Sequence, residues 1–222
     1  MSDIAGNIIA VKEQIPSHVK LVAVSKQKPV EDILEAYNCG HRVFGENRAQ
    51  ELIEKAASLP DDVEWHFIGH LQSNKVKFIV PFIHLIQSVD SFKILKVINK
   101  EAYKNRRVVD CLLQFYIAKE ETKYGFSPEE AAEMLKSDEF MELLNVKIIG
   151  VMGMASFVDD QEQIRNEFVN LRNIFQTLKD EYLSDSKEFK EISMGMSGDY
   201  MIAVEEGSTI IRLGTKIFTE NS

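Results

Sequence analysis

Apolar residues along the chain fall into short runs that alternate with longer segments of helical periodicity. A run of four to seven apolar residues predicts a buried strand, whereas apolar residues repeating every three to four positions predict one buried face of a helix. The sequence contains eight such runs, which start near residues 21, 42, 64, 83, 108, 146, 190 and 209. The clearest helical segment carries its apolar stripe at Ile164, Phe168, Leu171, Phe175 and Leu178.

Strands that alternate with helices indicate parallel pairing through right-handed crossovers. Eight such units fit a (β/α)8 barrel, although 222 residues fall slightly short of the usual ~250. An open doubly wound sheet is the alternative, but no Gly-x-Gly-x-x-Gly follows the first strand, which disfavours a dinucleotide-binding version. We therefore predict an α/β fold, a single-domain (β/α)8 TIM-type barrel over about 20–218 with an extra N-terminal helix over about 1–15, and one domain across 1–222.

The composition narrows the class of protein. Lys and Arg number 26 against 35 Asp and Glu, and the net charge of −9 makes nucleic acid or an anionic membrane an unfavourable partner. The N-terminus carries no signal peptide, and no apolar run approaches the roughly 18–20 residues of a membrane span. The two cysteines, Cys39 and Cys111, lack CxxC spacing. These features predict a cytoplasmic protein with reduced structural thiols and with neither nucleic acid nor membrane as a partner.

In a barrel of this kind, the C-terminal ends of the strands meet at one mouth, where chemistry gathers. Polar or glycine-rich segments follow several of the apolar runs at that position. The seventh and eighth runs end in SMGMSGD (193–199) and RLGT (212–215). Their glycines allow close backbone approach, and backbone N–H groups with Ser and Thr hydroxyls can bind a phosphate dianion. The same residue types are ordinary helix caps, so spacing alone leaves both interpretations open.

Lys26 follows the first run, LVAVS, and has three interpretations. It is a solvated strand-end lysine, the partner of an anion, or an amine that does chemistry. With a phosphate site at the same mouth, a phosphate-bearing aldehyde bonded to Lys26 describes pyridoxal 5′-phosphate (PLP). Arg212 has only hydrogen-bond donors, so beside a pyridine nitrogen it would keep that nitrogen unprotonated and weaken the ring as an electron sink. A surface or salt-bridged arginine is the alternative.

Five segments in order resemble one known family. They are VAVSK (22–26), FGEN (44–47), WHFIGHLQSNK (65–75), SMGMSGD (193–199) and STIIRLGTKIF (208–218). Together they look like the PLP homeostasis proteins of the YggS/PROSC type, whose fold is like the N-terminal barrel of alanine racemase. The resemblance covers about residues 20 to 218. It departs from the family pattern at His70 and at Thr219-Glu220, away from the implied cofactor contacts.

The resemblance implies that PLP is held as a Schiff base on Lys26. It implies phosphate contacts from Ser197, Gly214 and Thr215, with Arg212 facing the pyridine nitrogen. Two further residues would line the cofactor pocket: Asn47 and Met152. The resemblance also implies a monomer that acts in intracellular PLP homeostasis and delivery and in amino-acid and keto-acid balance, with apo PLP enzymes as candidate recipients.

Strong catalytic turnover is not expected. Racemisation needs acid–base groups on both faces of the bound substrate, and Lys26 could serve only one of them. In two-domain racemases the opposing tyrosine comes from a second domain of a partner subunit, whereas this chain ends directly after its eighth unit. The alternative is a slow single-domain PLP-dependent amino-acid racemase, and a third is a PLP-independent aldolase that uses Lys26 on a sugar phosphate. His66 and His70 do not suggest a metal pair, so no metal site is predicted.

Overall fold

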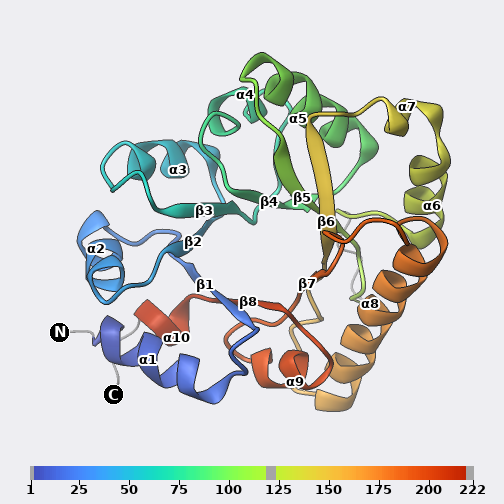
Figure 1. Ribbon diagram of the computed structural model, residues 1–222. Helices are drawn as coiled ribbons and strands as arrows, with labels where there is room; N and C mark the ends of the chain where they lie inside the picture. Colours follow the sequence, from blue (N-terminus) through green and yellow to red (C-terminus); the bar gives the residue numbers. More distant parts are fainter. Residues whose placement is uncertain (1–2, 119–123, 219–222) are drawn as a thin grey trace.

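Eight parallel strands close into a barrel in which each strand pairs with its neighbour in sequence and β1 pairs with β8. The computed structural model describes residues 3–118 and 124–218. Figure 1 looks along the barrel, with the strands as a central ring and the helices outside it. The strands are β1 (Lys20–Val24), β2 (Val43–Glu46), β3 (Glu64–Phe67), β4 (Leu85–Val89), β5 (Val109–Gln114), β6 (Val146–Met152), β7 (Glu191–Ser193) and β8 (Ile210–Leu213). The predicted (β/α)8 barrel is confirmed.

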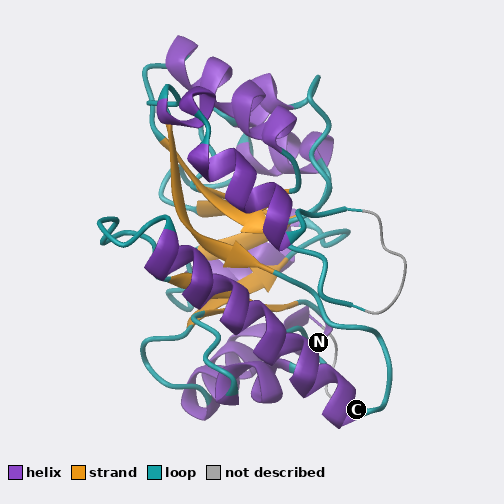
Figure 2. Cartoon of the chain, turned by 90° about the vertical axis from the view of Figure 1, so that its right-hand side faces the viewer, coloured by secondary structure: helices purple, strands orange, loops and turns teal. Residues whose placement is uncertain are grey.

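Helices surround the strands on the outside, as the side view shows (Figure 2). The chain begins with α1, which packs against α2 and α10 next to the closure of the barrel. The helices are α1 (Ile4–Gln14), α2 (Val30–Asn38), α3 (Ala49–Ala56), α4 (Val76–Ile79), α5 (Phe92–Lys104), α6 (Pro128–Lys136), α7 (Asp138–Met141), α8 (Gln161–Glu181), α9 (Tyr200–Glu205) and α10 (Thr215–Phe218). None of the helices within the described ranges is long and apolar enough to cross a membrane.

Local sequence signals fix several helix ends. Ser127 accepts a hydrogen bond from the backbone N–H of Glu130, and the Glu130 carboxylate accepts one from the backbone N–H of Ser127. This capping box, with Pro128 as the first helical residue, starts α6. The apolar stripe of α8 is likewise buried, and Phe168 and Leu171 are fully inaccessible.

Two apolar clusters form the core. The larger one lies between the barrel and the surrounding helices and includes Ile33, Leu52 and Phe168. The smaller one fills the barrel interior: its buried members are Val22, Leu85, Leu112, Met152 and Ile210. Because side chains alternate along a strand, the outward residues build the first cluster and the inward residues build the second.

The strand boundaries differ from the ends of the apolar runs by up to three residues. The first strand is Lys20–Val24, where the run is LVAVS (21–25), and β7 spans only Glu191–Ser193 within the run FKEISMG (189–195). The apolar pattern continues into the loops because residues such as Met194 and Phe189 remain fully buried outside the hydrogen-bonded ladder. The buried apolar run is therefore longer than the hydrogen-bonded strand within it.

Candidate functional site

The structure brings the seven predicted site residues to the C-terminal end of the barrel. Lys26 lies two residues after β1, and Asn47 directly follows β2. Met152 is the last residue of β6, and Ser197 lies in the loop between β7 and α9. The eighth strand supplies the other three: Arg212 within β8, Gly214 directly after it, and Thr215 at the start of α10. Parallel strands in a closed barrel all end on the same side, so these segments share one rim.

A buried ion pair holds the turn that carries Lys26. The Nζ of Lys55 donates to the backbone carbonyl of Ser25 at 2.7 Å and to Oε1 of Glu46 at 2.7 Å. The hydroxyl of Ser25 donates to the same Oε1 at 2.6 Å. Lys55 also reaches Oε1 of Glu51 at 2.6 Å. Both residues that flank Lys26 are tied to this group, since Glu51 accepts the backbone N–H of Gln27 at 2.5 Å.

Gln27 adopts φ of 61°, a left-handed conformation that non-glycine residues seldom take. The hydrogen bond from its N–H to Glu51 accompanies this conformation. Lys26 itself is exposed, and within the described residues its side chain has no hydrogen bond or ion pair to another group. The turn is thus fixed at Ser25 and Gln27 while the amine between them stays available.

The loops after β7 and β8 lie against each other and against β1. The backbone N–H of Lys216 approaches the hydroxyl of Ser197 at 3.5 Å. A Cβ on Gly214 would lie 3.3 Å from the carbonyl oxygen of Val24, so the β8 loop sits beside the end of β1. Gly195, with φ of 97°, leaves no room for a side chain, because a Cβ there would lie 2.6 Å from that of Ala203. Glycine is therefore required at position 195, where the β7 loop packs against α9.

Arg212 is buried inside the barrel with both terminal nitrogens engaged. Its Nη1 donates to the hydroxyl of Ser193 at 2.5 Å, and its Nη2 donates to the carbonyl oxygen of Gly153 at 3.0 Å. Burial lowers the pKa of Arg212 to about 10, and the charge of Asp199 opposes that shift. The guanidinium remains charged at neutral pH. Its burial excludes the surface-arginine interpretation.

A chain of hydrogen bonds runs from Arg212 through the barrel interior. The Ser193 hydroxyl donates to Oε1 of Gln87 at 2.6 Å, and Nε2 of Gln87 lies 2.8 Å from Nδ1 of His66. Sequence reasoning missed Gln87 and Ser193. The available signal was a polar residue at an inward position of an otherwise apolar strand, as in LIQSV, since such a residue needs a buried partner.

Asn47 and Met152 occupy different environments. The Oδ1 atom of Asn47 is buried and has no hydrogen-bond partner among the described residues. A buried acceptor without a donor costs free energy, so this atom suits a ligand that supplies a hydrogen. Met152 is fully buried in the interior cluster, and its contact with a cofactor stays a prediction.

The residues at this rim have the donor and acceptor types that PLP requires. Within residues 3–118 and 124–218, they include an amine at Lys26 without a hydrogen bond or ion pair, hydroxyls and glycine backbone at the β7 and β8 loops, and an acceptor at Asn47 without a donor. Arg212 adds a buried group that can only donate. The donor set therefore fits a phosphorylated aromatic aldehyde.

The fold and this rim define a barrel protein of the alanine racemase N-terminal class. The sequence matches the family model for the alanine racemase N-terminal domain over residues 1–222. Among curated proteins, the pyridoxal phosphate homeostasis protein of Aquifex aeolicus is 43% identical over 202 residues, which is 90% of this chain and 86% of that protein. The human pyridoxal phosphate homeostasis protein is 37% identical over 211 residues, or 90% of this chain and 76% of that protein. The chain belongs to the pyridoxal phosphate homeostasis protein family.

Solved structures agree with this assignment. PipY from Synechococcus elongatus PCC7942, solved without PLP, superposes with a TM-score of 0.91 at 36% identity, covering 97% of this chain and 100% of PipY. The structure of PipY with PLP bound gives a TM-score of 0.88 over the same shares of the two chains.

Proposed function

We propose that the protein binds PLP as a Schiff base on Lys26 and acts in intracellular PLP homeostasis and delivery. The observation that carries this proposal is the packing of Gly214 beside Val24, two residues before Lys26. That packing supports the proposal because it puts the β8 loop beside the strand that leads to Lys26, whose side chain has no hydrogen bond or ion pair within the described residues. PipY, a homologue at 36% identity whose structure holds PLP, supports the same cofactor for this chain.

Each residue then has a defined task. Ser197, Thr215 and the backbone at Gly214 bind the phosphate, because hydroxyls and backbone N–H groups satisfy its oxygens without a cluster of lysines. Arg212 donates toward the ring nitrogen and does not supply it with a proton. Asn47 offers its unsatisfied Oδ1 as an acceptor. PLP itself supplies the aldehyde with which a lysine amine condenses, releasing water.

The proposed attachment is tested on purified protein incubated with PLP and then dialysed. We expect a visible absorbance band that borohydride removes, and a reduced phosphopyridoxyl group at Lys26 in peptide mass spectrometry. Lys26→Ala should abolish both signals. Lys28→Ala is the matched control two residues away and should leave the modified peptide in place. A label on another lysine, or none, would overturn the assignment.

Assays on the PLP-loaded protein distinguish a PLP carrier from a PLP enzyme. A carrier transfers PLP to an apo PLP enzyme faster than free PLP at the same concentration restores its activity. Racemase assays on a panel of amino acids test the alternative, and sustained turnover on any of them would replace the carrier by a slow racemase. A protein that takes up no PLP but is trapped by borohydride on a sugar phosphate would instead be an aldolase.

We also propose a monomer located in the cytoplasm. The thiols of Cys39 and Cys111 are both free, and reduced cysteines are usual in that compartment. Light scattering of the eluted protein tests the first statement, and fractionation of cells tests the second. A stable dimer at micromolar concentration, or recovery in a secreted fraction, would contradict them.

A further inference from the structure

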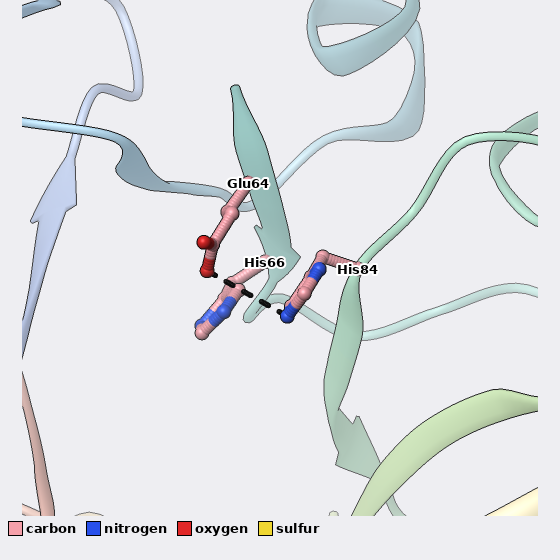
Figure 3. Close-up of side chains that lie close together, drawn as sticks. All are labelled: Glu64, His66 and His84. Atoms are coloured by element: carbon pink, nitrogen blue, oxygen red, sulfur yellow. Dashed lines mark ion pairs between the residues drawn. The ribbon is translucent and has the colours of Figure 1, made fainter. Parts of the chain in front are cut away.

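A second group of polar side chains lies at the opposite end of the barrel from Lys26. Glu64 is the first residue of β3, His66 is the third, and His84 directly precedes β4. Figure 3 shows the three side chains converging from these neighbouring strands. One ligand atom from each lies within 4.8 Å of the other two, and Oε2 of Glu64 lies 3.6 Å from Nε2 of His84.

His66 is the buried member of the group. Its side chain is fully inaccessible, and its Nε2 has no hydrogen-bond partner within the described ranges. Leaving such a group unpaired in the interior costs roughly 1–3 kcal/mol. The other ring nitrogen, Nδ1, is held 2.8 Å from the side-chain amide of Gln87. The ring is therefore fixed on one side and unsatisfied on the other.

The hydrogen bond at Nδ1 decides which tautomer His66 adopts. As placed, the amide nitrogen of Gln87 donates to Nδ1. Coordination through Nε2 therefore requires the Gln87 amide to turn and present Oε1 to an Nδ1–H.

We propose that Glu64, His66 and His84 bind one divalent metal ion of the zinc class at the N-terminal end of the barrel. Donor–metal distances of about 2.0–2.2 Å put two donors on one ion roughly 3 to 4.4 Å apart. The 3.6 Å between Glu64 and His84 already lies within that range. The rings of His66 and His84 are stacked with centroids 5.8 Å apart, so His84 must turn to aim its nitrogen at an ion beside His66.

Solvent exposure allows His84 to rotate toward His66. The side chains of His84 and Glu64 are 50% and 39% accessible, so both can change conformation and an ion can reach them from solvent. Two imidazoles and one carboxylate favour Zn²⁺, Co²⁺ or Ni²⁺ over Mg²⁺ and Ca²⁺, which prefer oxygen ligands. With three protein ligands, a water molecule would complete a tetrahedral shell. The ammonium of Lys20 is the unfavourable neighbour, since it repels a cation as it repels a proton on His66.

The spacing of histidines in the sequence does not indicate this site. His66 and His70 are the closely spaced pair, but His70 lies elsewhere and pairs through Nδ1 with Asp90 at 2.7 Å. His84 is eighteen positions from His66 in the chain and reaches it only because β3 and β4 are neighbours. The sequence analysis considered only His70 as a partner for His66.

The site is tested by titrating the untagged, chelator-treated chain with ZnCl₂, and with CoCl₂ as a spectroscopic probe. We expect one Zn²⁺ per chain and a Co²⁺ visible spectrum of a four-coordinate nitrogen–oxygen site. His84→Gln and Glu64→Gln change exposed side chains, and each should weaken binding at least about tenfold. Lys20→Met should tighten binding, because it removes the repelling charge.

His70→Gln is the matched control, since it removes an exposed histidine that pairs with a carboxylate at the other end of the barrel. It should leave Zn²⁺ affinity unchanged. Binding that falls equally in His70→Gln and His84→Gln, or that has no unit stoichiometry, would show adventitious surface binding and overturn the proposal. None of these readouts involves PLP, so the result is independent of the proposed function.

Discussion

Lys55 and Glu46 form a buried ion pair, Nζ to Oε1 at 2.7 Å, directly beneath the turn that carries Lys26. Their side chains are 7% and 0% accessible. Lys55 also donates to the carbonyl of Ser25, so one ammonium joins strands β1 and β2 at the rim. Burial raises the pKa of Glu46, and hydrogen bonds from Lys55 and Ser25 oppose that rise. The pair therefore offsets part of the cost of burying a charged carboxylate at this position.

Removing Lys55 should destabilise the protein severely. Lys55→Met keeps the length of the side chain but leaves the Glu46 carboxylate buried without its cation. Breaking one half of a buried pair typically costs about 3–5 kcal/mol. Urea unfolding monitored by circular dichroism measures the loss, and the double variant Glu46→Gln/Lys55→Met should recover part of it. A single variant as stable as the wild type would show that the pair is not an important contributor.

The same substitution tests whether the pair positions Lys26. If the folded Lys55→Met protein takes up PLP, we expect slower attachment and a shifted pH dependence of its visible band, because the turn is less constrained. Lys104→Met is the matched control. Its ammonium pairs with Glu101 at the surface, and its loss should alter neither property. An unchanged pH titration in Lys55→Met would limit the pair to a structural role.

The hydroxyl of Ser197 should contribute directly to PLP affinity. Ser197→Ala removes one hydrogen-bond donor from the proposed phosphate loop, and a bond to a charged group is worth roughly 1.5–3 kcal/mol, or about tenfold to a hundredfold in affinity. Equilibrium dialysis against PLP measures the change. Ser17→Ala, at an exposed serine before β1, serves as the control and should bind PLP like the wild type. Equal affinity in the two variants would remove Ser197 from the phosphate site.

Much of the fold follows from the sequence because hydrophobic periodicity reports burial. Eight apolar runs give eight strands, and the Ser127–Glu130 box gives the start of α6. The rim could also be predicted, since a residue that follows a parallel strand has only one end of the barrel to occupy. Val24 and Gly214 come together for that reason, through the pairing of β1 with β8.

The supporting residues could not be predicted in the same way. Lys55 lies on α3 at a position where helical lysines are ordinarily solvated, and only the packing of α3 against the barrel buries its amine. Gln87 and Ser193 are 106 positions apart and meet across the barrel interior. The sequence indicates that such polar residues need hydrogen-bond partners, but only the folded structure shows which residues those partners are.

Arg212 should not tolerate its closest chemical substitute. Lysine has a single terminal nitrogen and cannot reproduce the planar fork that reaches both Ser193 and the carbonyl of Gly153. Arg212→Lys should lower the free energy of unfolding by roughly 1–3 kcal/mol, because one buried acceptor loses its donor. Arg172→Lys is the control, since the side chain of Arg172 is 44% accessible and Glu206 keeps its second partner Arg165, so its change should stay within about 0.5 kcal/mol. Equal losses would contradict a special role for the fork.

His41 should make the native state sensitive to moderate acid. Burial lowers the pKa of His41 from 6.5 to about 4, while the hydrogen bond to the carbonyl of Val43 opposes the shift. His41 is therefore protonated below about pH 6.5 in the unfolded chain, but only below about pH 4 in the native state. The contribution of His41 to the free energy of unfolding is fully present above pH 6.5. It falls by roughly 2 to 3 kcal/mol as the pH decreases toward 4.

His41→Gln removes the titrating group and isolates this contribution. The difference in free energy of unfolding between wild type and variant, measured by urea titration at several pH values, should shift in favour of the variant as the solution is acidified. Carboxylates that titrate in the same range cancel in that difference, because both proteins contain them. Parallel stability curves for the two proteins would show that His41 is protonated as easily in the native state as in the unfolded chain.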